Sequence, residues 1–408
     1  IGILSATASF GFQKPVTIKE QGSFMAGGTI VTAPGVYKDS EPTNYDGETL
    51  HGDHAYVFYQ KPMNAKKNSI VFLHGYGQSG KSWETTPDGR DGFQNIFLEK
   101  GYNTYIVDQP RRGRAGQSTV ARNLTARPDD QLWYNNFRIG QWPGIYDNVS
   151  VPRDNESREQ FFRQMTPDTG DFNQKVVADA MVKVFEKSGN GVLVTHSAGG
   201  GPGWDTAIAS DKVKGVIALE PGTFPFTKGK LPEVEKTTSP FPAKGYEVSD
   251  AEFKKLTKIP IVVYFGDNIP TELTDNWGLD NWRIRVNLAK KWEKMMNEAG
   301  GDVKVVMTKN ATNIIGPLTL ETLSKNRIYV DMWDTNPHYE VEHISLADWA
   351  DMVLIAPATY NIIGKVANGI ADDMLTTIIS AVSIRKPLFF ALAMNVNMYE
   401  NPILKENI

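Results

Sequence analysis

Cysteine is absent from this chain of 408 residues, and its absence removes several kinds of chemistry at once. The chain can form no disulfide, has no thiolate nucleophile and cannot build a zinc or iron site on sulfur. No metal site is expected from the other residues either. Any nucleophile must therefore be an oxygen or a nitrogen.

An excess of positive charge is also missing. The chain has 43 Lys and Arg against 47 Asp and Glu, a net charge of −4 and a pI near 6.0. Because this balance offers no basic field to phosphate backbones, nucleic acid is not expected as a partner. The most apolar zone, 352–384, is interrupted by Lys365, Asp372 and Asp373, so no membrane span is expected either.

The first ten residues, "IGILSATASF", begin with Ile1 and not with Met. Ala6-Thr7-Ala8 fits the small-residue cleavage site at the end of a secretory signal, which favours a periplasmic or secreted location. The alternative is an ordinary first strand.

Short apolar runs that end in Gly, Asp or Ser recur along the first three quarters of the chain. They are typical of buried parallel strands and cover 69–75, 102–108, 191–197, 213–222 and 259–267. Helical stretches at 174–188 and 283–299 alternate with them, which predicts an α/β fold. The aromatic-rich segment 115–165 breaks this rhythm and indicates an insertion that covers the sheet and lines a substrate site. Residues 223–258 show little periodicity and are expected to be loop.

A second α/β pattern begins after residue 306. It consists of strand-like runs at 327–334, 350–359 and 386–395, and of an apolar helix expected over 365–383. We therefore expect two domains, 1–305 with a mainly parallel sheet and 306–408 as a second, smaller α/β unit.

The loop "GYGQSGKS", residues 75–82, fits three patterns. It matches the phosphate cradle of P-loop NTPases, the dinucleotide fingerprint and the oxyanion loop of a hydrolase. Both phosphate interpretations need a helix that opens at Lys81 and Ser82, and the following "WETTPDGRDGF" is a poor helix former. Asp108 would imitate the metal-binding aspartate of an NTPase. A glycine turn without chemistry is a further alternative.

"VLVTHSAGG" places Ser197 between a strand and small residues that open a helix. This is the arrangement of a nucleophile elbow, in which a sharp turn exposes the hydroxyl beside main-chain amides. Thr195 stands where the G-x-S-x-G pattern has its first glycine, and the alternative is a helix N-cap serine. Glu220 and Asp267, each at the end of a later strand, are both candidates for the acid that orients a histidine.

The segments "LHGYGQSGKSWETTPDGRDGF", "GYNTYIVDQPRRGRAG", "THSAGG", "ALEPG" and "IPIVVYFGDN" together resemble bacterial serine esterases of the α/β-hydrolase fold, over about residues 20–305. The resemblance implies that Ser197 is the nucleophile and Glu220 the acid of an enzyme that hydrolyses small carboxylic esters without a cofactor. It also implies that the amides of Tyr76 and Ala198 form the oxyanion hole, and that Asp267 is structural.

The catalytic histidine expected from this resemblance is missing. The chain order of the fold is Ser, acid, His, and in the esterases the histidine follows the strand that matches "GGDVKVV". Here the next residues are "MTKNATNIIGPLTL", without a histidine. Only His338 and His343 lie downstream of Glu220, and His338 is the freer candidate for a surrogate base.

Residues of about 300–408 resemble the flavoprotein phosphopantothenoylcysteine decarboxylase of coenzyme A synthesis, through "GGDVKVVMTKNATNIIGPLTLETLSKNRIYVDMW", "HISLADWADMVLIAPATYNIIGKVANGIADDML" and "AMNVNMYENP". The resemblance implies a partial flavodoxin-like, three-layer α/β fold and a cytoplasmic homo-oligomer with FMN between subunits. It assigns His343 to the active site and Asn395 to substrate contact. It implies that the flavin is lined by Thr308, Ala356, Pro357, Ala358, Thr359 and Asn361. Without the resemblance, His343 could equally be a histidine at the start of a helix with no catalytic function.

Several features of that family are not found in this sequence. Leu392 replaces the proline expected before "AMN", and the first strand with its glycine-rich phosphate loop is missing, as is the C-terminal substrate clamp with its cysteine. The helix expected at 283–299 cannot supply a phosphate cradle of main-chain amides. These departures predict that FMN is not retained. The alternative is weak, substoichiometric flavin held by the "APAT" loop and by contacts between subunits.

The stretch "GGDVKVV" fits both families, so the chain passes from one to the other near Val305. We expect a serine esterase that lacks its histidine, joined to a truncated decarboxylase-like flavoprotein. The alternatives are an FMN-dependent decarboxylase of coenzyme A synthesis, and a catalytically silent chimera or P-loop nucleotide binder.

Overall fold

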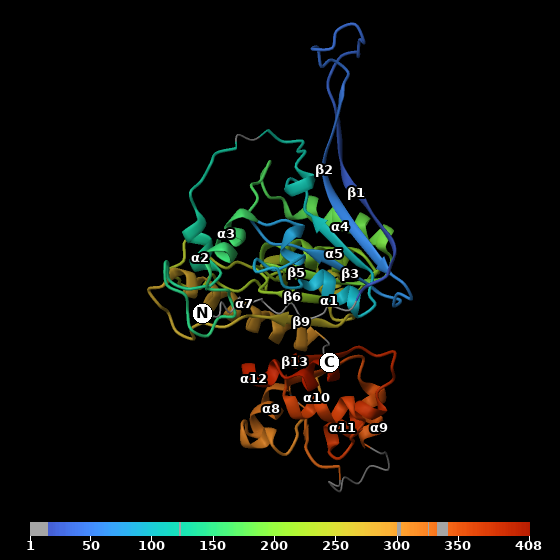
Figure 1. The fold of residues 1–408 in the computed structure, drawn as a ribbon, viewed down its shortest axis with the longest axis vertical. Helices are drawn as coiled ribbons and strands as arrows, with labels where there is room; N and C mark the ends of the chain where they lie inside the picture. The colour runs from blue at the N-terminus through green and yellow to red at the C-terminus, as the bar shows by residue number, and fades with distance from the viewer. Residues whose placement is uncertain (1–14, 122–123, 300–302, 325, 333–341) are drawn as a thin grey trace, which may run out of the picture. The chain divides into compact units, whose positions relative to one another are not determined.

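The computed structural model of the chain describes residues 15–121, 124–299, 303–324, 326–332 and 342–408. The chain forms two compact units, Ile1–Met296 and Asn297–Ile408, and each is described by itself below (Figure 1). The N-terminal decapeptide, in which the sequence indicates either a signal remnant or a strand, lies outside the described residues.

The first unit is built on a seven-stranded sheet of order β1-β2-β4-β3-β5-β6-β9. The three strands β1, β2 and β4 pair antiparallel, and the others pair parallel. β3 and β4 are buried along their whole length, as strands covered on both faces must be. The strands are β1 (Ile18–Thr32), β2 (Thr49–Pro62), β3 (Ser69–Leu73), β4 (Thr104–Asp108), β5 (Gly191–His196), β6 (Val213–Leu219) and β9 (Ile261–Tyr264).

Helices connect these strands as the alternating pattern predicts. In α4 the buried residues Val177, Ala180, Met181, Val184 and Phe185 recur at helical spacing. α7 begins six residues before the expected start at 283. The helices of the first unit are α1 (Phe93–Glu99), α2 (Asp130–Asn136), α3 (Asn155–Arg163), α4 (Gln174–Ser188), α5 (Gly200–Ala209), α6 (Asp250–Leu256) and α7 (Trp277–Ala299).

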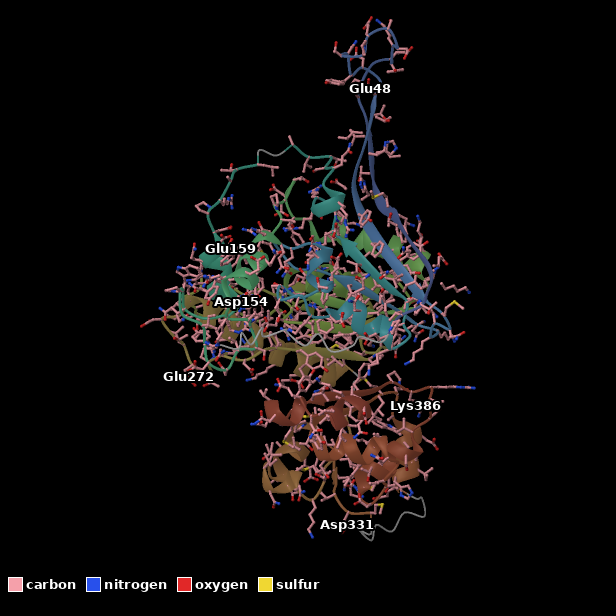
Figure 2. All side chains as sticks on the ribbon, in the orientation of Figure 1. Glu48, Asp154, Glu159, Glu272, Asp331 and Lys386 are labelled. Carbon is pink, nitrogen blue, oxygen red and sulfur yellow. The ribbon has the colours of Figure 1, made fainter. Side chains whose placement is uncertain are left out.

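Two segments of the first unit hold more regular structure than the sequence indicated. The segment expected to be loop contains α6, with a Ser249–Glu252 capping box, and the short strand pair β7 (Pro225–Thr227) and β8 (Tyr246–Val248). β1 and β2, which the sequence did not reveal, continue beyond the sheet as a two-stranded ribbon (Figure 1). Figure 2 places Glu48 toward the tip of this ribbon.

The strand order fixes where a ligand can bind. β3 has β4 on one side and β5 on the other, so the chain direction across the sheet reverses next to β3. In open α/β sheets, ligands bind at the carboxyl ends of the strands that flank such a switch point. The loop after β3 begins at His74 and the loop after β5 begins at Ser197, so the fold brings both candidate segments to one edge.

The second unit has four short strands that form two separate parallel pairs among its described residues. β10 (Val305–Val306) pairs with β11 (Ile328–Tyr329), and β12 (Val353–Ala358) pairs with β13 (Leu388–Leu392). The helices are α8 (Pro317–Ser324), α9 (Glu342–Trp349), α10 (Tyr360–Ala367), α11 (Met374–Ala381), α12 (Val396–Tyr399) and α13 (Pro402–Asn407).

The single helix expected over 365–383 is wrong, because the chain forms α10 and α11 with a break between them. Gly369 has a φ of +67°, a left-handed conformation that ends the first helix. Asp373 then opens α11 with a capping box to Thr376. The run looked continuous because apolar residues stand on both sides of this turn. In the described part of the chain, no helix is both long and apolar enough to cross a bilayer.

Candidate active site

Ser197 is the first residue after β5 and has a left-handed backbone, with a φ of +51°. It opens the 3₁₀ element η3 (Ser197–Gly199), which leads directly into α5. A non-glycine residue in this region is strained, and such strain is typical of a nucleophile elbow. The geometry therefore agrees with the expectation from the sequence, although the role of Ser197 stays a proposal.

Thr195 fits into the elbow because a glycine elsewhere makes room for it. A Cβ atom built on Gly203, in α5, would lie 2.6 Å from Cγ2 of Thr195. The strand and the helix can approach closely only if one of these two positions has no side chain. The glycine missing at position 195 is thus replaced, in its packing role, by Gly203.

The loop after β3 packs directly against the elbow. A Cβ atom on Gly75 would lie 2.9 Å from Cβ of Ser197. Oε1 of Gln78 accepts a hydrogen bond from the Gly75 N–H at 3.0 Å and lies 2.8 Å from Nδ1 of His196. Tyr76 stacks on Trp133 of the aromatic insertion, with 5.8 Å between ring centroids.

The phosphate-binding interpretations of this loop lack the helix that they need. Residues Gly80–Trp83 form one 3₁₀ turn, and helix α1 begins only at Phe93. Asp108 accepts hydrogen bonds from the Gly80 N–H at 2.6 Å and from Nε of Arg114 at 2.8 Å. Its carboxylate thus ties the loop to β4, a structural use of the residue that would bind a metal in an NTPase.

Glu220 is also in a left-handed conformation, with a φ of +49°, just after β6. Its turn is tied to the elbow, since the Gly222 N–H donates to the carbonyl oxygen of Ser197 at 3.0 Å. Oε1 of Glu220 accepts from the Gly266 N–H at 2.8 Å and from the guanidinium of Arg138. Among the described residues, no hydrogen bond reaches Oε2, which leaves this oxygen for another donor.

Arg138 is a site residue that the sequence did not reveal. It belongs to the aromatic insertion, is buried, and donates through Nε to the carbonyl oxygen of Asp267 at 2.8 Å as well as to Glu220. Asp267 therefore contributes a main-chain acceptor here, which agrees with a structural role. The ion pair joins residues 82 positions apart, and no local pattern marks such a contact.

The two histidines nearest the elbow are engaged elsewhere. Nδ1 of His74 donates to the carbonyl oxygen of Gly75 at 2.8 Å, and Nε2 accepts from the Gln109 N–H at 3.1 Å. These two contacts correspond to a neutral tautomer of His74. Complete burial favours the neutral ring and lowers the pKa of His74 to about 4. Burial likewise lowers the pKa of His196, whose ring stacks on Phe137. Neither ring hydrogen-bonds to Ser197 or Glu220.

The histidines downstream of Glu220 belong to the second unit. His343 lies in the first turn of α9 and is half-buried. His338, the expected surrogate base, lies outside the described residues.

A pocket of about 300 Å³ opens at Ser197. Its walls combine aromatic rings, amide side chains and one charged residue, Arg285, whose pKa burial lowers to about 10. The pocket is lined by Tyr76, Asn136, Phe172, Gln174, Ser197, Ala198, Gly222, Thr223, Phe241, Asn281, Trp282 and Arg285. Tyr76 and Ala198, the expected oxyanion residues, thus share a pocket with the candidate nucleophile.

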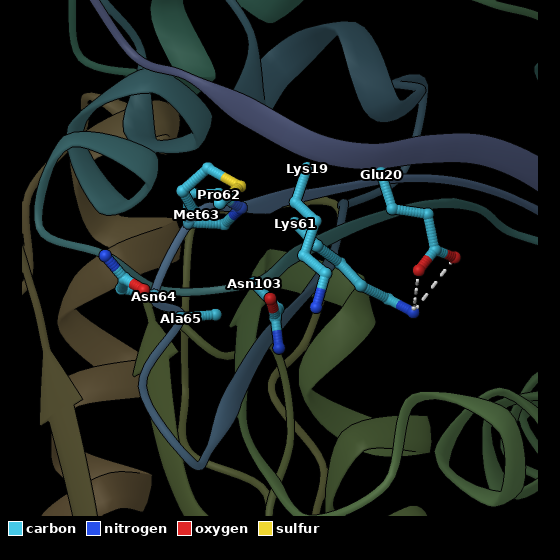
Figure 3. A pocket seen from close by; sticks show the side chains of 8 residues that line it. All are labelled: Lys19, Glu20, Lys61, Pro62, Met63, Asn64, Ala65 and Asn103. Carbon is cyan, nitrogen blue, oxygen red and sulfur yellow. Dashed lines mark hydrogen bonds and ion pairs between the residues drawn. The ribbon is translucent and has the colours of Figure 1, made fainter.

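A second pocket, of about 470 Å³, lies at the C-terminal end of β2, and none of the residues described around it is a candidate nucleophile (Figure 3). Lys61 and Glu20 form an ion pair of 3.0 Å beside it, and Lys19 points into the same region. It shares no residue with the pocket at Ser197.

In the second unit, the residues expected to line a flavin gather at the ends of the strands. Ala356, Pro357 and Ala358 end β12, Thr359 is the N-cap of α10, and Asn361 lies in the first turn of that helix. The Ala393 N–H donates to the carbonyl oxygen of Ala358 at 3.0 Å, which places the "AMN" segment beside "APAT". Asn395 caps α12 by accepting from the Asn397 N–H at 2.9 Å. Thr308 follows β10, in the other strand pair, and accepts from the Ala311 N–H at 3.2 Å.

Comparison with known proteins finds two families along the chain. Residues 70–312 match the model of the alpha/beta hydrolase family, and residues 287–408 match the model described as flavoprotein. The matches overlap at 287–312, the stretch in which the sequence fits both patterns.

Individual relatives agree with this division. A solved structure of a novel bacterial esterase is 26% identical, with a TM-score of 0.55, and the match covers 77% of this chain and 98% of that one. A probable secreted lipase, phiG, of a fungal species is 31% identical over 186 residues, 42% of this chain and 50% of the lipase. The coenzyme A biosynthesis bifunctional protein CoaBC of Borreliella burgdorferi is 62% identical over 109 residues, which is 27% of each chain. The chain thus spans about a quarter of the length of CoaBC.

Proposed function

The chain belongs to the alpha/beta hydrolase family, and from this premise we propose that its first unit is a serine hydrolase of small carboxylic esters. The observation that carries the proposal is the strained elbow at Ser197, which opens into a pocket and is tied by a hydrogen bond to the turn that holds Glu220. We assign the role of nucleophile to Ser197 and that of the acid to Glu220.

The proposed reaction begins with attack of Oγ of Ser197 on the ester carbonyl carbon. The main-chain amides of Tyr76 and Ala198 would stabilise the negative charge on the former carbonyl oxygen. Ala198 lies in the first turn of η3, where main-chain N–H groups have no partner within the element. The acyl group passes to Ser197, the alcohol leaves, and water then releases the acid.

A base must take the Ser197 proton, and Glu220 would orient that base through Oε2. In the described part of the first unit no histidine does so. We therefore propose that turnover is very low, since loss of the base of a Ser-His-acid set costs on the order of 10⁴- to 10⁶-fold.

Covalent labelling tests the assignment of the nucleophile. A fluorophosphonate probe should label the protein at Ser197, slowly because no base assists, and Ser197→Ala should abolish the label. The neighbouring hydroxyl variant Thr195→Val serves as the matched control and should still be labelled. Labelling that persists in Ser197→Ala would refute the assignment.

An esterase-like α/β hydrolase domain is thus joined in this chain to a CoaBC-like flavoprotein domain. For the second domain we propose weak, substoichiometric FMN binding and no decarboxylase turnover, with the two domains meeting near residue 305. The exposed end of β12 leaves Ala356, Pro357 and Thr359 accessible to a flavin ring. We also assign His343 to the active site of this domain and Asn395 to substrate contact, and we propose that the domain forms a homo-oligomer.

The strand pairing supports the weak binding. In a doubly wound sheet the phosphate-binding loop follows the first strand, at the point where the strand order reverses. The pairs β10–β11 and β12–β13 are separate, and no described strand joins them. The residues at β12 therefore fit a flavin ring, but the described residues do not provide a cradle for its phosphate.

A further inference from the structure

Among the described residues that line the pocket at Ser197, Arg285 is the one that carries a charge. It lies on α7, beside Asn281 and Trp282, and faces the pocket together with Phe241. Neither the proposed nucleophile nor the acid uses it. Its presence in an otherwise uncharged pocket therefore requires a separate explanation.

The hydrogen bonds of Arg285 all come from one of its three nitrogens. Nη1 donates to the main-chain oxygen of Asn281 at 2.6 Å, to Oδ1 of Asn281 at 2.5 Å and to the main-chain oxygen of Phe241 at 3.4 Å. A guanidinium has five N–H donors in a planar fork. Within the described residues, Nε and Nη2 have no acceptor, and neither is among the fully buried side-chain atoms that lack a partner. These donors thus remain available on the accessible side of the side chain.

The other arginines around the site differ in this respect. Arg138 pairs with Glu220, Arg112 with Asp168, and Arg283 with Asp280. For Arg285, by contrast, no carboxylate of the described residues lies within ion-pair distance. Burial lowers the pKa of Arg285 to about 10, so the guanidinium is still charged at neutral pH. A partly desolvated cation without a counter-ion is costly, and such groups are normally paired.

We propose that the substrate cleaved at Ser197 carries a carboxylate that pairs with Arg285. The proposal rests on the hydrolase function and names its substrate class: a half-ester of a dicarboxylic acid, or another small ester with one free carboxylate. Two N–H groups of a guanidinium fork match the two oxygens of a carboxylate. The rings of Phe172 and Phe241 then contact the apolar chain between the ester and the carboxylate, while the guanidinium of Arg285 lies over the buried Trp282, 5.6 Å from its ring centroid.

The test compares two esters that differ only in the terminal charge. p-Nitrophenyl hydrogen adipate has a free carboxylate, and p-nitrophenyl hexanoate ends in a methyl group at a similar distance. For each, p-nitrophenol release is measured and the rate of Ser197→Ala is subtracted as background. A charge-assisted hydrogen-bonded pair predicts that Arg285→Met lowers the ratio of the anionic to the neutral rate by about 10- to 100-fold.

Two further variants control for charge and folding. Arg285→Lys keeps the positive charge and should retain most of the preference for the anionic ester. Lys290→Met removes a charge from an exposed position of the same helix and should leave the ratio unchanged. A ratio that is equal in the parent and in Arg285→Met would overturn the proposal.

A binding measurement separates this proposal from the hydrolase function. Monomethyl adipate is titrated into Ser197→Ala, with and without Arg285→Met, and its binding is followed by calorimetry. Binding that depends on Arg285 supports the carboxylate site even if no variant hydrolyses any ester, a result that would refute only the hydrolase function. If hydrolysis depends on Ser197 but Arg285→Met changes neither the rate ratio nor the binding, the carboxylate site is wrong and the hydrolase function is still supported.

Discussion

The substitution Asp280→Asn tests how the wall of the candidate active site is held in place. Asp280 is fully buried in α7, and Oδ1 accepts from Nε of Arg283 at 2.5 Å. Oδ2 accepts from the Thr238 N–H at 2.9 Å and from the hydroxyl of Thr237. The segment anchored in this way continues to Phe241, which lines the pocket at Ser197.

The expected loss of stability can be worked out from the pKa of the Asp280 carboxyl group. Burial alone would raise the pKa of Asp280, but the hydrogen bonds from Arg283, Thr237 and Thr238 outweigh it and lower the pKa from 3.8 to about 2. The difference between 3.8 and about 2 corresponds to ~2.5 kcal/mol of stability. Because the pKa is lowered on folding, this contribution is complete above about pH 5 and is lost progressively as the pH falls through 3.8 toward 2. We expect Asp280→Asn to lower the free energy of unfolding by ~2–4 kcal/mol at neutral pH, since Arg283 keeps Glu235 as a partner.

Urea unfolding followed by tryptophan fluorescence at pH 7 and pH 3 measures both effects. Seven of the nine tryptophans lie in the first unit, so the signal reports mainly on it. Asp179→Asn is the matched control: Asp179 forms an exposed pair with Lys175, and its loss should cost less than ~1 kcal/mol. If both variants unfold alike at pH 7, or if Asp280→Asn loses as much stability between pH 7 and pH 3 as the parent does, the buried carboxylate of Asp280 does not stabilise the fold in this way.

Two more predictions concern the elbow and the flavoprotein domain. Gly203→Ala should destabilise the protein by ~1–3 kcal/mol in urea unfolding, because the new methyl group meets Cγ2 of Thr195. Thr195→Ser removes that Cγ2 atom and should relieve most of the loss in the double variant. Additive losses would show that the two positions do not pack against each other. Purified protein should retain much less than an equimolar amount of flavin, measured by absorbance after denaturation, and an equimolar amount would show that the phosphate is held despite the separate strand pairs.

The sheet and the elbow could be predicted from the sequence because their signals are local. Each buried parallel strand is a short apolar run that ends in Gly, Asp or Ser, and Ser197 stands at the end of one of them. β1 gave no such signal: most of its residues are exposed, and its glycines interrupt any alternation. The break between α10 and α11 was hidden in an apolar run, although Gly369 marks the end of one helix and the pair Asp373–Thr376 marks the start of the next.

The contacts that complete the candidate site are not local. Arg138 reaches Glu220 across 82 residues, and Gly203 compensates for Thr195 only because α5 packs on β5. Arg285 is one of several basic residues on α7, and only the fold shows that it lines the pocket while Arg283 pairs with Asp280. Such pairings depend on which elements meet, and the periodicity of a single segment does not contain that information.

The most direct test of a hydrolase site without its base is p-nitrophenyl acetate hydrolysis by the parent and by His338→Ala, measured side by side with Ser197→Ala as the background. We expect the parent to turn over on the order of 10⁴- to 10⁶-fold more slowly than a complete Ser-His-acid hydrolase, and His338→Ala to be equally slow. Strong activity in the parent that collapses in His338→Ala would show that the second domain donates the histidine and that the site does not lack its base.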